Sequence, residues 1–320
     1  MIGRICGTGK AVPKKILTND DLTKIIDTSD EWIKERTGIS QRHIIQDETT
    51  TSLAQEAAKQ ALNNSGLNGE DIDMIIVATV TPDVLVPSVA CYVQEFIGAK
   101  NSFCLDINAA CVGFLMAFNM AQNAIASGTC KNALVIGAES LSTIVNWEDR
   151  SSCTLFGDGA GAAVLKGEEG DSPISLMYTD GSRGDFLKCE TRRQSNWQER
   201  EELKATYLSM GGQDVFRFAT KEVPKSIYNV LDKAGVSADD IDYFVLHQAN
   251  KRIVETIARR MRLDLDKFPM NIGTYGNTSS ASIPLLLADM DLNGQIKKGM
   301  KLVIAGFGGG LTWGASYVEI

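Results

Sequence analysis

The stretch "LNNSGLNGEDIDMIIVA" (62–78) decides the fold, because the chain repeats it further on. The later segment "LDKAGVSADDIDYFVLH" (231–247) aligns with it without a gap, so that Asp71 meets Asp240 at an offset of 169 (240 − 71). Later in each half, "KNALVIGA" (131–138) is echoed by "GMKLVIAG" at nearly the same offset, 168 (302 − 134). Two matches in nearly one register indicate an internal duplication.

Helical and strand patterns alternate along both halves, which indicates an α/β fold. Short apolar runs predict buried strands, and longer periodic stretches predict helices. The predicted strands are 74–80, 133–138, 243–247 and 301–307, and the predicted helices include 50–65, 111–127 and 250–262. We therefore expect two duplicated α/β halves, residues 1–169 and residues 170–320, packed around a pseudo-twofold axis.

The composition limits the classes of protein that fit. With 320 residues, of which 44% are hydrophobic, the chain can bury a substantial core. The net charge of −8 argues against non-specific binding to nucleic acid. The first residues, "MIGRICGTGKAVPKK", lack the architecture of a signal peptide, and no apolar run is long enough to cross a bilayer. We therefore expect a cytoplasmic protein with no membrane partner.

The cysteine pattern agrees with that location. The chain has seven cysteines, an odd number, with no CxxC and no Cys/His spacing typical of zinc sites. Free thiols in a reducing compartment fit this pattern best, and no metal site is predicted.

Cys111 lies in "LDINAACVGFLMAF" (105–118), where a predicted strand gives way to an apolar helix that Gly128 closes. The positive end of the helix dipole would favour the thiolate form of this cysteine, as a nucleophile requires. Ordinary core packing is the alternative, because free cysteine is among the most buried residue types.

Only two histidines are present. His43 lies in a polar stretch and is predicted to be on the surface. His247 ends a predicted strand, so it is the better candidate to act with a cysteine. A structural or solvent-facing histidine is the alternative at this position.

The repeat offset places Cys111 opposite Ser279 and Ser280, which follow Asn277 closely in the chain. Ligands in α/β folds bind outside the carboxyl ends of the strands. We therefore expect Cys111, His247 and Asn277 to share one site. A turn or N-cap role is the alternative for the asparagine.

The glycine-rich segment "GFGGGLTWG" (306–314) follows a predicted strand. It lacks the Lys-Ser/Thr pair of a phosphate-binding loop. Its glycines suit a tight turn that presents backbone N–H groups to an oxyanion.

Taken together, these motifs resemble the beta-ketoacyl-acyl-carrier-protein synthase III family of thiolase-fold condensing enzymes. The matching segments run from end to end of the chain: "DEWIKERTGISQRHI" (30–44), "DINAACVGF" (106–114), "FGDGAGAAVL" (156–165), "LHQANKRI" (246–253), "YGNTSSASIP" (275–284) and "GFGGGLTWG" (306–314). The resemblance implies a thiolase-like fold in five α-β-α-β-α layers, and a homodimer.

The resemblance also implies roles for particular residues. The family's catalytic triad falls on Cys111, His247 and Asn277, and its oxyanion hole and aromatic gate fall on Gly309 and Phe307. The implied contacts to coenzyme A are Thr28, Trp32, Arg36 and Arg150; those to the acyl carrier protein are Arg217, Arg252, Arg259 and Arg260; and those to the acyl group are Val86, Leu141, Leu155 and Phe156. For the tryptophan and the arginines, a buried side chain and solvated charges are the alternatives.

The implied reaction is the decarboxylative Claisen condensation that initiates fatty acid synthesis. An acyl-CoA primer would load Cys111, and malonyl-acyl carrier protein would then condense with the acyl group, without any cofactor. A relative that primes a polyketide or quinolone pathway from CoA thioesters is one alternative, and a non-catalytic subunit is another. No cysteine follows Cys189, which argues against a thiolase, and Asn277 replaces the second histidine of the longer-chain synthases.

Two features stay open at this point. Val86 stands where an acetyl-preferring relative has phenylalanine, a residue that in this family reaches the acyl pocket of the neighbouring subunit, so the primer is undecided. The charged segment "KCETRRQSNWQEREELK" (188–204) is longer than the family pattern and is predicted to be a solvated loop, with a mobile lid as the alternative.

Overall fold

Two large β-sheets form the frame of the computed structural model, which describes residues 1–190 and 206–320. The first sheet contains, in spatial order, β1 (Ile2–Ala11), β7 (Gly159–Glu168), β6 (Asn132–Glu139), β4 (Met74–Ala78) and β5 (Phe103–Ile107). The second sheet contains β11 (Tyr243–Leu246), β12 (Lys301–Gly308), β13 (Thr312–Glu319) and β8 (Ile174–Thr179).

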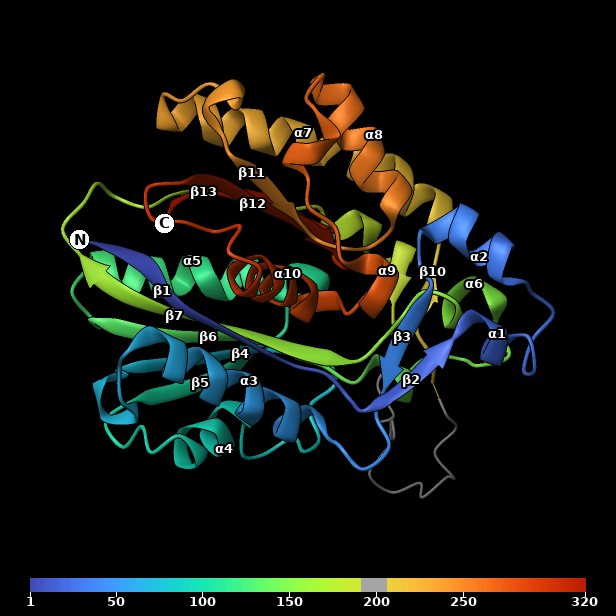
Figure 1. Cartoon of the computed structure of the whole chain (residues 1–320), viewed down its shortest axis with the longest axis horizontal. Helices are drawn as coiled ribbons and strands as arrows, with labels where there is room; N and C mark the ends of the chain where they lie inside the picture. The colour runs from blue at the N-terminus through green and yellow to red at the C-terminus, as the bar shows by residue number, and fades with distance from the viewer. Residues whose placement is uncertain (191–205) are drawn as a thin grey trace.

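Helices cover both sheets and fill the space between them. The main helices are α3 (Thr50–Ser65), α4 (Val89–Phe96), α5 (Gly113–Ala126), α7 (Gly212–Ala234), α8 (Lys251–Met261) and α10 (Ser282–Leu292). Figure 1 shows α3 and α4 on the outer face of the first sheet, α7 and α8 on the outer face of the second, and α5 and α10 between the sheets. This arrangement confirms the predicted five α-β-α-β-α layers.

Helices α5 and α10 are apolar on nearly every side because each lies between the two sheets. Phe114 and Phe118 of α5 and Leu285 of α10 are at most 1% exposed. Burying one such side chain contributes about 1.5–3 kcal/mol. As predicted, Gly128 closes α5 with a φ of 77°, and its N–H donates to the Ile125 carbonyl.

The duplication is visible element by element. The strands β4 and β11 begin at an offset of 169 (243 − 74), and so do β6 and β12, and α5 and α10. The helices that precede β4 and β11 end at Gly66 and Gly235, which have φ values of 70° and 66°. A left-handed C-cap of this kind favours glycine, which explains why both copies have it.

The offset of 168 that the sequence indicated for the later match is too small by one. Ala133 pairs with Met74 in the first sheet, and Leu302 pairs with Tyr243 at the same place in the second. The structural offset is therefore 169 (302 − 133). Runs of Ala, Leu, Val and Ile match one another in neighbouring registers, whereas a strand shifted by one residue would turn its side chains to the wrong face.

The two halves differ at one edge. β5 borders the first sheet, whereas the matching residues 272–276 of the second half include the short helix α9 (Ile272–Tyr275). The first sheet thus keeps an open edge at β5. We propose residues 1–169 and 170–320 as the two halves, because this boundary lies in the connection between β7 and β8.

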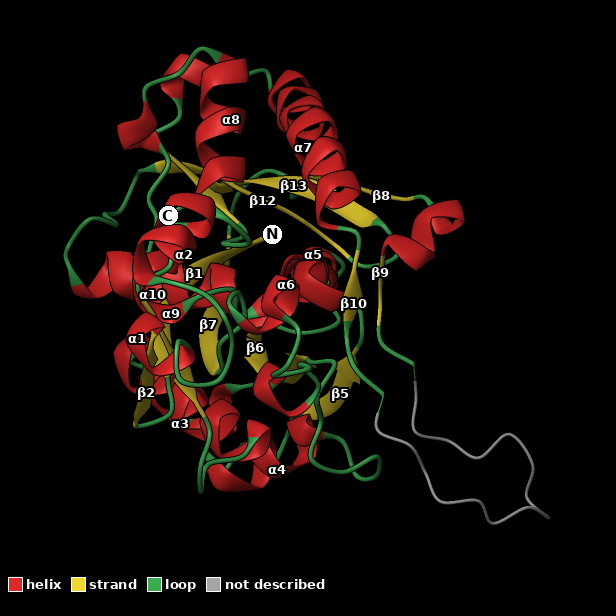
Figure 2. Ribbon diagram, turned by 90° about the vertical axis from the view of Figure 1, so that its right-hand side faces the viewer, coloured by secondary structure: helices red, strands yellow, loops and turns green. Residues whose placement is uncertain are grey.

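Short elements gather at one end of the layers (Figure 2). They are β2 (Lys15–Thr18), α1 (Asn19–Leu22), α2 (Asp30–Thr37), β3 (Gln41–Ile44), α6 (Arg150–Cys153), β9 (Leu187–Lys188) and β10 (Ser209–Met210). Short 3-10 turns connect the elements: η1 (Gly69–Asp71), η2 (Ala110–Val112), η3 (Leu141–Thr143), η4 (Gly181–Phe186), η5 (Ala238–Asp240), η6 (Leu265–Lys267) and η7 (Ser279–Ala281). Of the charged segment 188–204, only residues 188–190 belong to the described residues, so the loop predicted there lies outside them.

Candidate active site

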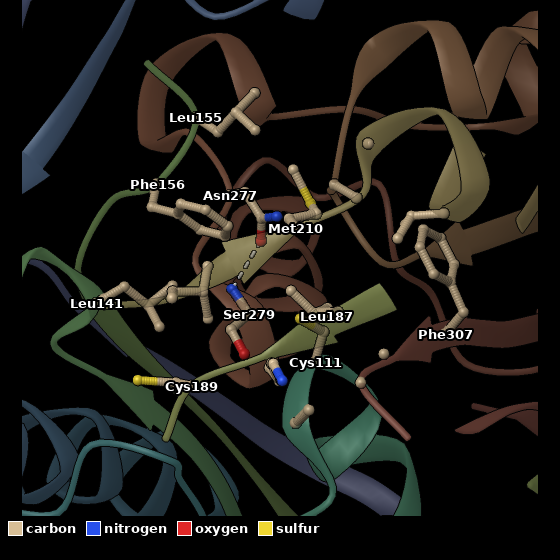
Figure 3. Close-up of a pocket in the computed structure, with 18 of the residues that line it drawn as sticks. Cys111, Leu141, Leu155, Phe156, Leu187, Cys189, Met210, Asn277, Ser279 and Phe307 are labelled. Carbon is tan, nitrogen blue, oxygen red and sulfur yellow. Dashed lines mark hydrogen bonds between the residues drawn. The ribbon is translucent and has the colours of Figure 1, made fainter. Parts of the chain in front are cut away.

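A cavity of about 1010 Å³ takes its walls from both halves of the chain. Cys111, His247 and Asn277 all line it, so the structure brings together the three residues predicted to share a site. Figure 3 shows Cys111 and Asn277 facing the same space, with Phe307 at one side. These side chains come from segments far apart in the sequence.

A sharp turn between β5 and α5 carries Cys111. This turn is η2, and its first residue, Ala110, has a φ of 46°, a backbone angle that residues other than glycine seldom adopt. Cys111 follows directly and lies just before the first turn of α5, with 8% of its surface exposed. The turn thus directs the thiol into the cavity from the start of a buried helix.

The state of the thiol differs from the expectation. Burial raises the pKa of Cys111 to about 11; a hydrogen bond with the Ser279 side chain acts against this rise, and a negative charge on the nearby Glu139 carboxyl would add to it. A helix dipole was expected to favour the thiolate, but the loss of hydration outweighs it here. The thiol of the free protein is therefore protonated at neutral pH, and its proton must leave when the nucleophile reacts.

Ser279 is the counterpart of Ala110 in the second half, again at an offset of 169 (279 − 110). Its φ of 50° gives η7 the same left-handed start as η2. Its side chain interacts with the Cys111 thiol, and its N–H donates to Asn277 Oδ1 at 2.9 Å. The sequence had placed Ser279 and Ser280 opposite Cys111, and the structural offset makes Ser280 the counterpart of Cys111. The bond from Ser279 to Asn277 could be found only in the structure.

His247 follows β11 directly and is 2% exposed. Its Nδ1 lies 2.6 Å from Ser282 Oγ, and its ring meets the Phe307 ring edge to face, with centroids 5.4 Å apart. Burial lowers the pKa of His247 to about 3, so the imidazole is neutral at physiological pH. The other histidine, His43, was predicted to be on the surface; this is wrong, because it is half-buried and its Nδ1 lies 2.6 Å from the Pro13 carbonyl.

Asn277 is held by its backbone and by one side-chain bond. Its N–H donates to the Leu155 carbonyl at 2.8 Å, and its carbonyl accepts the Gly157 N–H at 3.1 Å. Because Oδ1 accepts the Ser279 N–H, the amide nitrogen is the end of the side chain left for the cavity (Figure 3). The asparagine therefore offers donors rather than acceptors.

The glycine-rich turn between β12 and β13 lies against the cysteine. A Cβ atom built on Gly308 would stand 2.7 Å from the Cys111 nitrogen and 3.0 Å from the Val112 nitrogen. Gly309 also lines the cavity, and Phe307 is 4% exposed. Only a residue without a side chain lets this turn approach the amides of η2 so closely.

The outer part of the cavity carries an aromatic ring and two guanidinium groups. The Arg150 guanidinium lies 4.7 Å from the centre of the Trp32 ring, and that of Arg36 lies 5.7 Å from it. All three residues line the cavity. Thr28 does not line it, and its hydroxyl is buried without a hydrogen-bond partner.

The inner wall beside Asn277 is apolar. Leu141, Leu155 and Phe156 line it and are at most 9% exposed. Leu187 and Met210 add to the same wall and were not predicted (Figure 3). Val86 is 86% exposed and does not line this cavity, so a single chain does not place it at the acyl wall.

The predicted basic residues lie outside the cavity, on α7 and α8. Arg217, Arg252 and Arg259 are exposed, and the first turn of α8 borders the cavity through Ile253. Arg260 is also exposed, but its guanidinium donates to the Thr220 carbonyl of α7 at 2.6 Å. All four arginines are thus exposed on these helices. Arg217 Nη1 lies 3.9 Å from Asp214 Oδ1 and Arg259 Nη2 lies 3.4 Å from Thr256 Oγ1, whereas Arg260 is tied to the neighbouring helix.

Metal-ligating side chains do not cluster in the described part of the chain: residues 1–190 and 206–320 contain no group of three or more His, Cys, Asp or Glu side chains placed to hold an ion. In the same residues, no helix is both long and apolar enough to span a membrane.

Comparison with known proteins identifies the family. The model of 3-oxoacyl-[acyl-carrier-protein (ACP)] synthase III matches residues 105–181, and that of its C-terminal part matches residues 231–320. The chain is 49% identical to a beta-ketoacyl-acyl-carrier-protein synthase III of Clostridium acetobutylicum over 317 residues, which cover 98% of each chain. It is 48% identical to a synthase III of Bacillus anthracis over 314 residues, which cover 97% of this chain and 96% of the relative.

Solved structures agree. The 3-oxoacyl-acyl-carrier-protein synthase III of Aquifex aeolicus superposes with a TM-score of 0.93 at 44% identity, covering 99% of this chain and 100% of the other. The priming beta-ketosynthase of the R1128 polyketide pathway also gives a TM-score of 0.93, at 32% identity, covering 100% and 96%. On its fold and on these identities along its whole length, the chain belongs to the beta-ketoacyl-acyl-carrier-protein synthase III family.

Proposed function

We propose that this protein transfers an acyl group from acyl-CoA to Cys111 and joins it to malonyl-acyl carrier protein with loss of CO2, the condensation that starts fatty acid synthesis. The observation that carries the proposal is the meeting of Cys111, His247 and Asn277 in one cavity. A relative named beta-ketoacyl-acyl-carrier-protein synthase III is 49% identical over 98% of the chain, which supports the proposal.

In the first step, Cys111 Sγ attacks the thioester carbonyl, the bond from that carbon to the CoA sulfur breaks, and CoA leaves with the thiol proton. The carbonyl oxygen becomes an oxyanion on the way. The backbone N–H groups of Cys111 and Gly309 are the proposed donors, and the close packing of the glycine turn on η2 supports this. Removing one such donor typically costs about 3 kcal/mol.

In the second step, the bond to the malonyl carboxylate breaks, CO2 leaves, and the electron pair forms an enolate. The enolate carbon attacks the acyl-Cys111 carbonyl, the carbon–sulfur bond breaks, and Cys111 leaves as a thiolate that takes up a proton from water to restore the thiol. We assign the ring proton of His247 to Nε2, because Ser282 Oγ accepts the Gln248 N–H and has its own proton to give to Nδ1. Nε2–H and the amide N–H of Asn277 can then both donate to the enolate oxygen.

The outer cavity is the proposed site for coenzyme A. Trp32 and Arg150 would enclose the adenine, and because the guanidinium already lies over the indole ring in the free protein, the adenine must displace it or slide beneath it. Arg36 would bind a phosphate. Thr28 remains a proposed contact, to be reached only if the nucleotide extends beyond the cavity.

The carrier protein is proposed to dock on α7 and α8. Arg217 of α7 and Arg252 and Arg259 of α8 are exposed, and the first turn of α8, which contains Arg252, borders the cavity. An acidic carrier protein complements these charges. Arg260 contributes less in this proposal because it bonds to α7.

A homodimer is also proposed. Exposed apolar side chains gather on β5, on α4 and on the loop before α4; they are Val84, Leu85, Val86, Tyr92, Phe96 and Phe103. Such a patch beside an open sheet edge is typical of an interaction surface. We propose the cytoplasm as the location, on the odd number of cysteines. Acyl-CoA enters as a substrate, and we propose no resident cofactor.

Priming of a polyketide or quinolone pathway is not favoured. The R1128 polyketide ketosynthase is 32% identical to this chain, against 44–49% for the synthases III of Aquifex and Clostridium. A non-catalytic subunit does not account for the presence of all three polar side chains in the cavity.

The test is acyl transfer followed by condensation. Intact-mass spectrometry after incubation with acyl-CoA should find one acyl adduct, on Cys111, and Cys111→Ser should form none. The acylated protein should then consume malonyl-acyl carrier protein faster than malonyl-CoA, with a panel of primers defining the acyl group. An adduct on another cysteine, or full turnover by Cys111→Ser, would refute the proposal.

A further inference from the structure

Glu139 is a buried carboxyl group that the condensation described above does not use. It ends β6, it is 0% exposed, and the chain brings it beneath the turn that carries Cys111. The side chains that bond to it are all neutral hydroxyls: Thr79, Thr81, Ser279 and Ser280. Burying a carboxylate without a cation costs free energy, so the question is whether Glu139 is ionised or protonated.

One oxygen of Glu139 acts as an acceptor. Oε2 accepts the Val80 N–H at 3.1 Å and the Thr81 hydroxyl at 2.9 Å. Thr81 Oγ1 itself accepts the Ser140 N–H at 2.8 Å, so its own proton is free to point at Oε2. This oxygen is satisfied in either protonation state.

The contacts of Oε1 decide whether Glu139 is protonated. Ser280 Oγ lies 2.8 Å from Glu139 Oε1 and 2.9 Å from the Ala78 carbonyl oxygen, and a hydroxyl has only one proton to share between them. Two hydrogen bonds need two protons, and the Ala78 carbonyl oxygen has none to give. The serine proton must therefore serve the bond to Ala78. The contact between Oε1 and Ser280 Oγ then needs a proton from the carboxyl group. We infer that Glu139 is a protonated carboxylic acid that donates from Oε1 to Ser280 and positions η7 beneath Cys111.

The neutral acid has a consequence for Ser279. Ser279 Oγ lies 3.1 Å from Oε1, and its side chain also interacts with Cys111. An ionised Glu139 would hold the single proton of Ser279, whereas a neutral acid leaves this proton for the thiolate of Cys111. The N–H of Ser279 fixes Asn277, so the same acid also steadies the amide that faces the cavity. Burial raises the pKa of Glu139, in agreement with the proton count.

Glutamine is the matched test, because its amide can accept at the place of Oε2 and donate at the place of Oε1. Alkylation of Cys111 by iodoacetamide at fixed pH should slow by about 10-fold in Glu139→Ala, the usual size of a lost buried hydrogen bond. Glu139→Gln should restore most of that rate. The infrared difference spectrum of wild type minus Glu139→Gln should contain the C=O band of a protonated carboxylic acid.

Asp158 provides the control, because it is also 0% exposed but has backbone donors on both oxygens. Oδ1 accepts the Ser142 N–H and Oδ2 the Ile45 N–H, so an asparagine must turn its NH2 against one of them. Asp158→Asn should therefore lower Tm by about 4 °C or more, and Glu139→Gln by clearly less.

The inference is wrong if the infrared band of the acid is missing. It is also wrong if Glu139→Gln reacts with iodoacetamide as slowly as Glu139→Ala and loses as much Tm as Asp158→Asn, because both results would mean that Glu139 is ionised. The role given to Glu139, to position the residues around a catalytic Cys111, rests on the proposed function. The three measurements do not, since none of them needs turnover. A protein that passes these tests but does not condense substrates would instead refute the proposed function.

Discussion

The backbone of Gly308 lies directly against the amide of Cys111: a Cβ atom at residue 308 would stand 2.7 Å from that nitrogen. Real Cβ atoms do not approach a backbone nitrogen so closely, so the contact depends on glycine. It joins the end of β12 to the turn before α5, and Gly309, the next residue, lines the same cavity as Cys111. The proposed oxyanion hole is therefore built by two segments that only glycine allows to meet.

Gly308→Ala should therefore slow acylation of Cys111 by about 100-fold, the usual effect of losing one oxyanion donor. The rate of adduct formation with acyl-CoA, followed by intact-mass spectrometry, measures it. Gly314→Ala is the control on the same hairpin, because its Cβ would meet the Leu176 carbonyl at 2.4 Å, away from Cys111. Equal losses of acylation in both variants would mean that the hairpin, not the oxyanion hole, is disturbed.

The pKa of Cys111 predicts how the thiol reacts with pH. Because burial raises this pKa to about 11, the rate of alkylation by iodoacetamide should rise about tenfold per pH unit between pH 7 and 9, without a plateau. Between about pH 9 and 11 the folded protein holds a proton that the unfolded chain releases, so its stability should fall as the pH rises through this window. A plateau below pH 9 would contradict the buried, protonated thiol.

His247 and Asn277 should serve the enolate more than the thiol. Alanine at either position should lower the release of CO2 from malonyl-acyl carrier protein by about 100-fold and acylation of Cys111 much less. Radiolabelled CO2 and intact-mass spectrometry measure the two steps separately. Normal CO2 release by both variants would refute this division of roles.

The internal repeat predicted parts of this site that no single residue could indicate. The repeat offset placed Cys111 opposite Ser279 and Ser280. The structural offset of 169 pairs Cys111 with Ser280 and Ala110 with Ser279, and Ala110 and Ser279 share a left-handed φ, 46° and 50°. The thiolate form expected for Cys111 was wrong, because a sequence indicates where a helix begins but not how deeply its first residues are buried. Glu139 went unnoticed for a similar reason: its partners lie on two segments, 79–81 and 279–280, that are far from it in the sequence, and no spacing in the chain predicts these contacts.

The fold was predicted well where periodicity repeats and less well where it does not. Strands β4 and β11 follow from an apolar pattern that occurs twice. The register between β6 and β12 was misjudged by one residue, because similar apolar letters match in several registers while backbone pairing allows only one. The edge strand β5 has no counterpart in the second half, a difference that similarity between the halves cannot reveal.

The carrier-protein surface makes a prediction about salt. Arg252→Glu with Arg259→Glu should raise the KM for malonyl-acyl carrier protein by about 10-fold at low ionic strength and by less as salt is added. Acyl-CoA loading should change little. Lys297→Glu with Lys298→Glu makes the same change of charge on another exposed segment and should leave this KM unchanged. An equal loss with malonyl-CoA as the second substrate would point to a folding defect instead.

The choice of primer should depend on Val86, although it is 86% exposed in the single chain. It belongs to the apolar patch proposed to bind a second copy, from which it would reach the acyl wall formed by Leu141, Leu155 and Phe156. Valine leaves more room there than phenylalanine would, so branched or longer primers should fit. A well-packed methylene is worth about 1–3 kcal/mol, or about 10- to 200-fold in discrimination.

Val86→Phe should therefore lower the ratio of kcat/KM for isobutyryl-CoA or butyryl-CoA to that for acetyl-CoA by about 10-fold or more. Leu85→Phe is the control, because Leu85 is its neighbour and is 81% exposed; it should leave the ratio unchanged if only residue 86 enters the partner's cavity. Sedimentation of both variants must first establish that they form the same oligomer as the wild type. If the wild type strongly prefers acetyl-CoA and Val86→Phe does not move the ratio, neighbouring side chains close the space and Val86 does not set the primer.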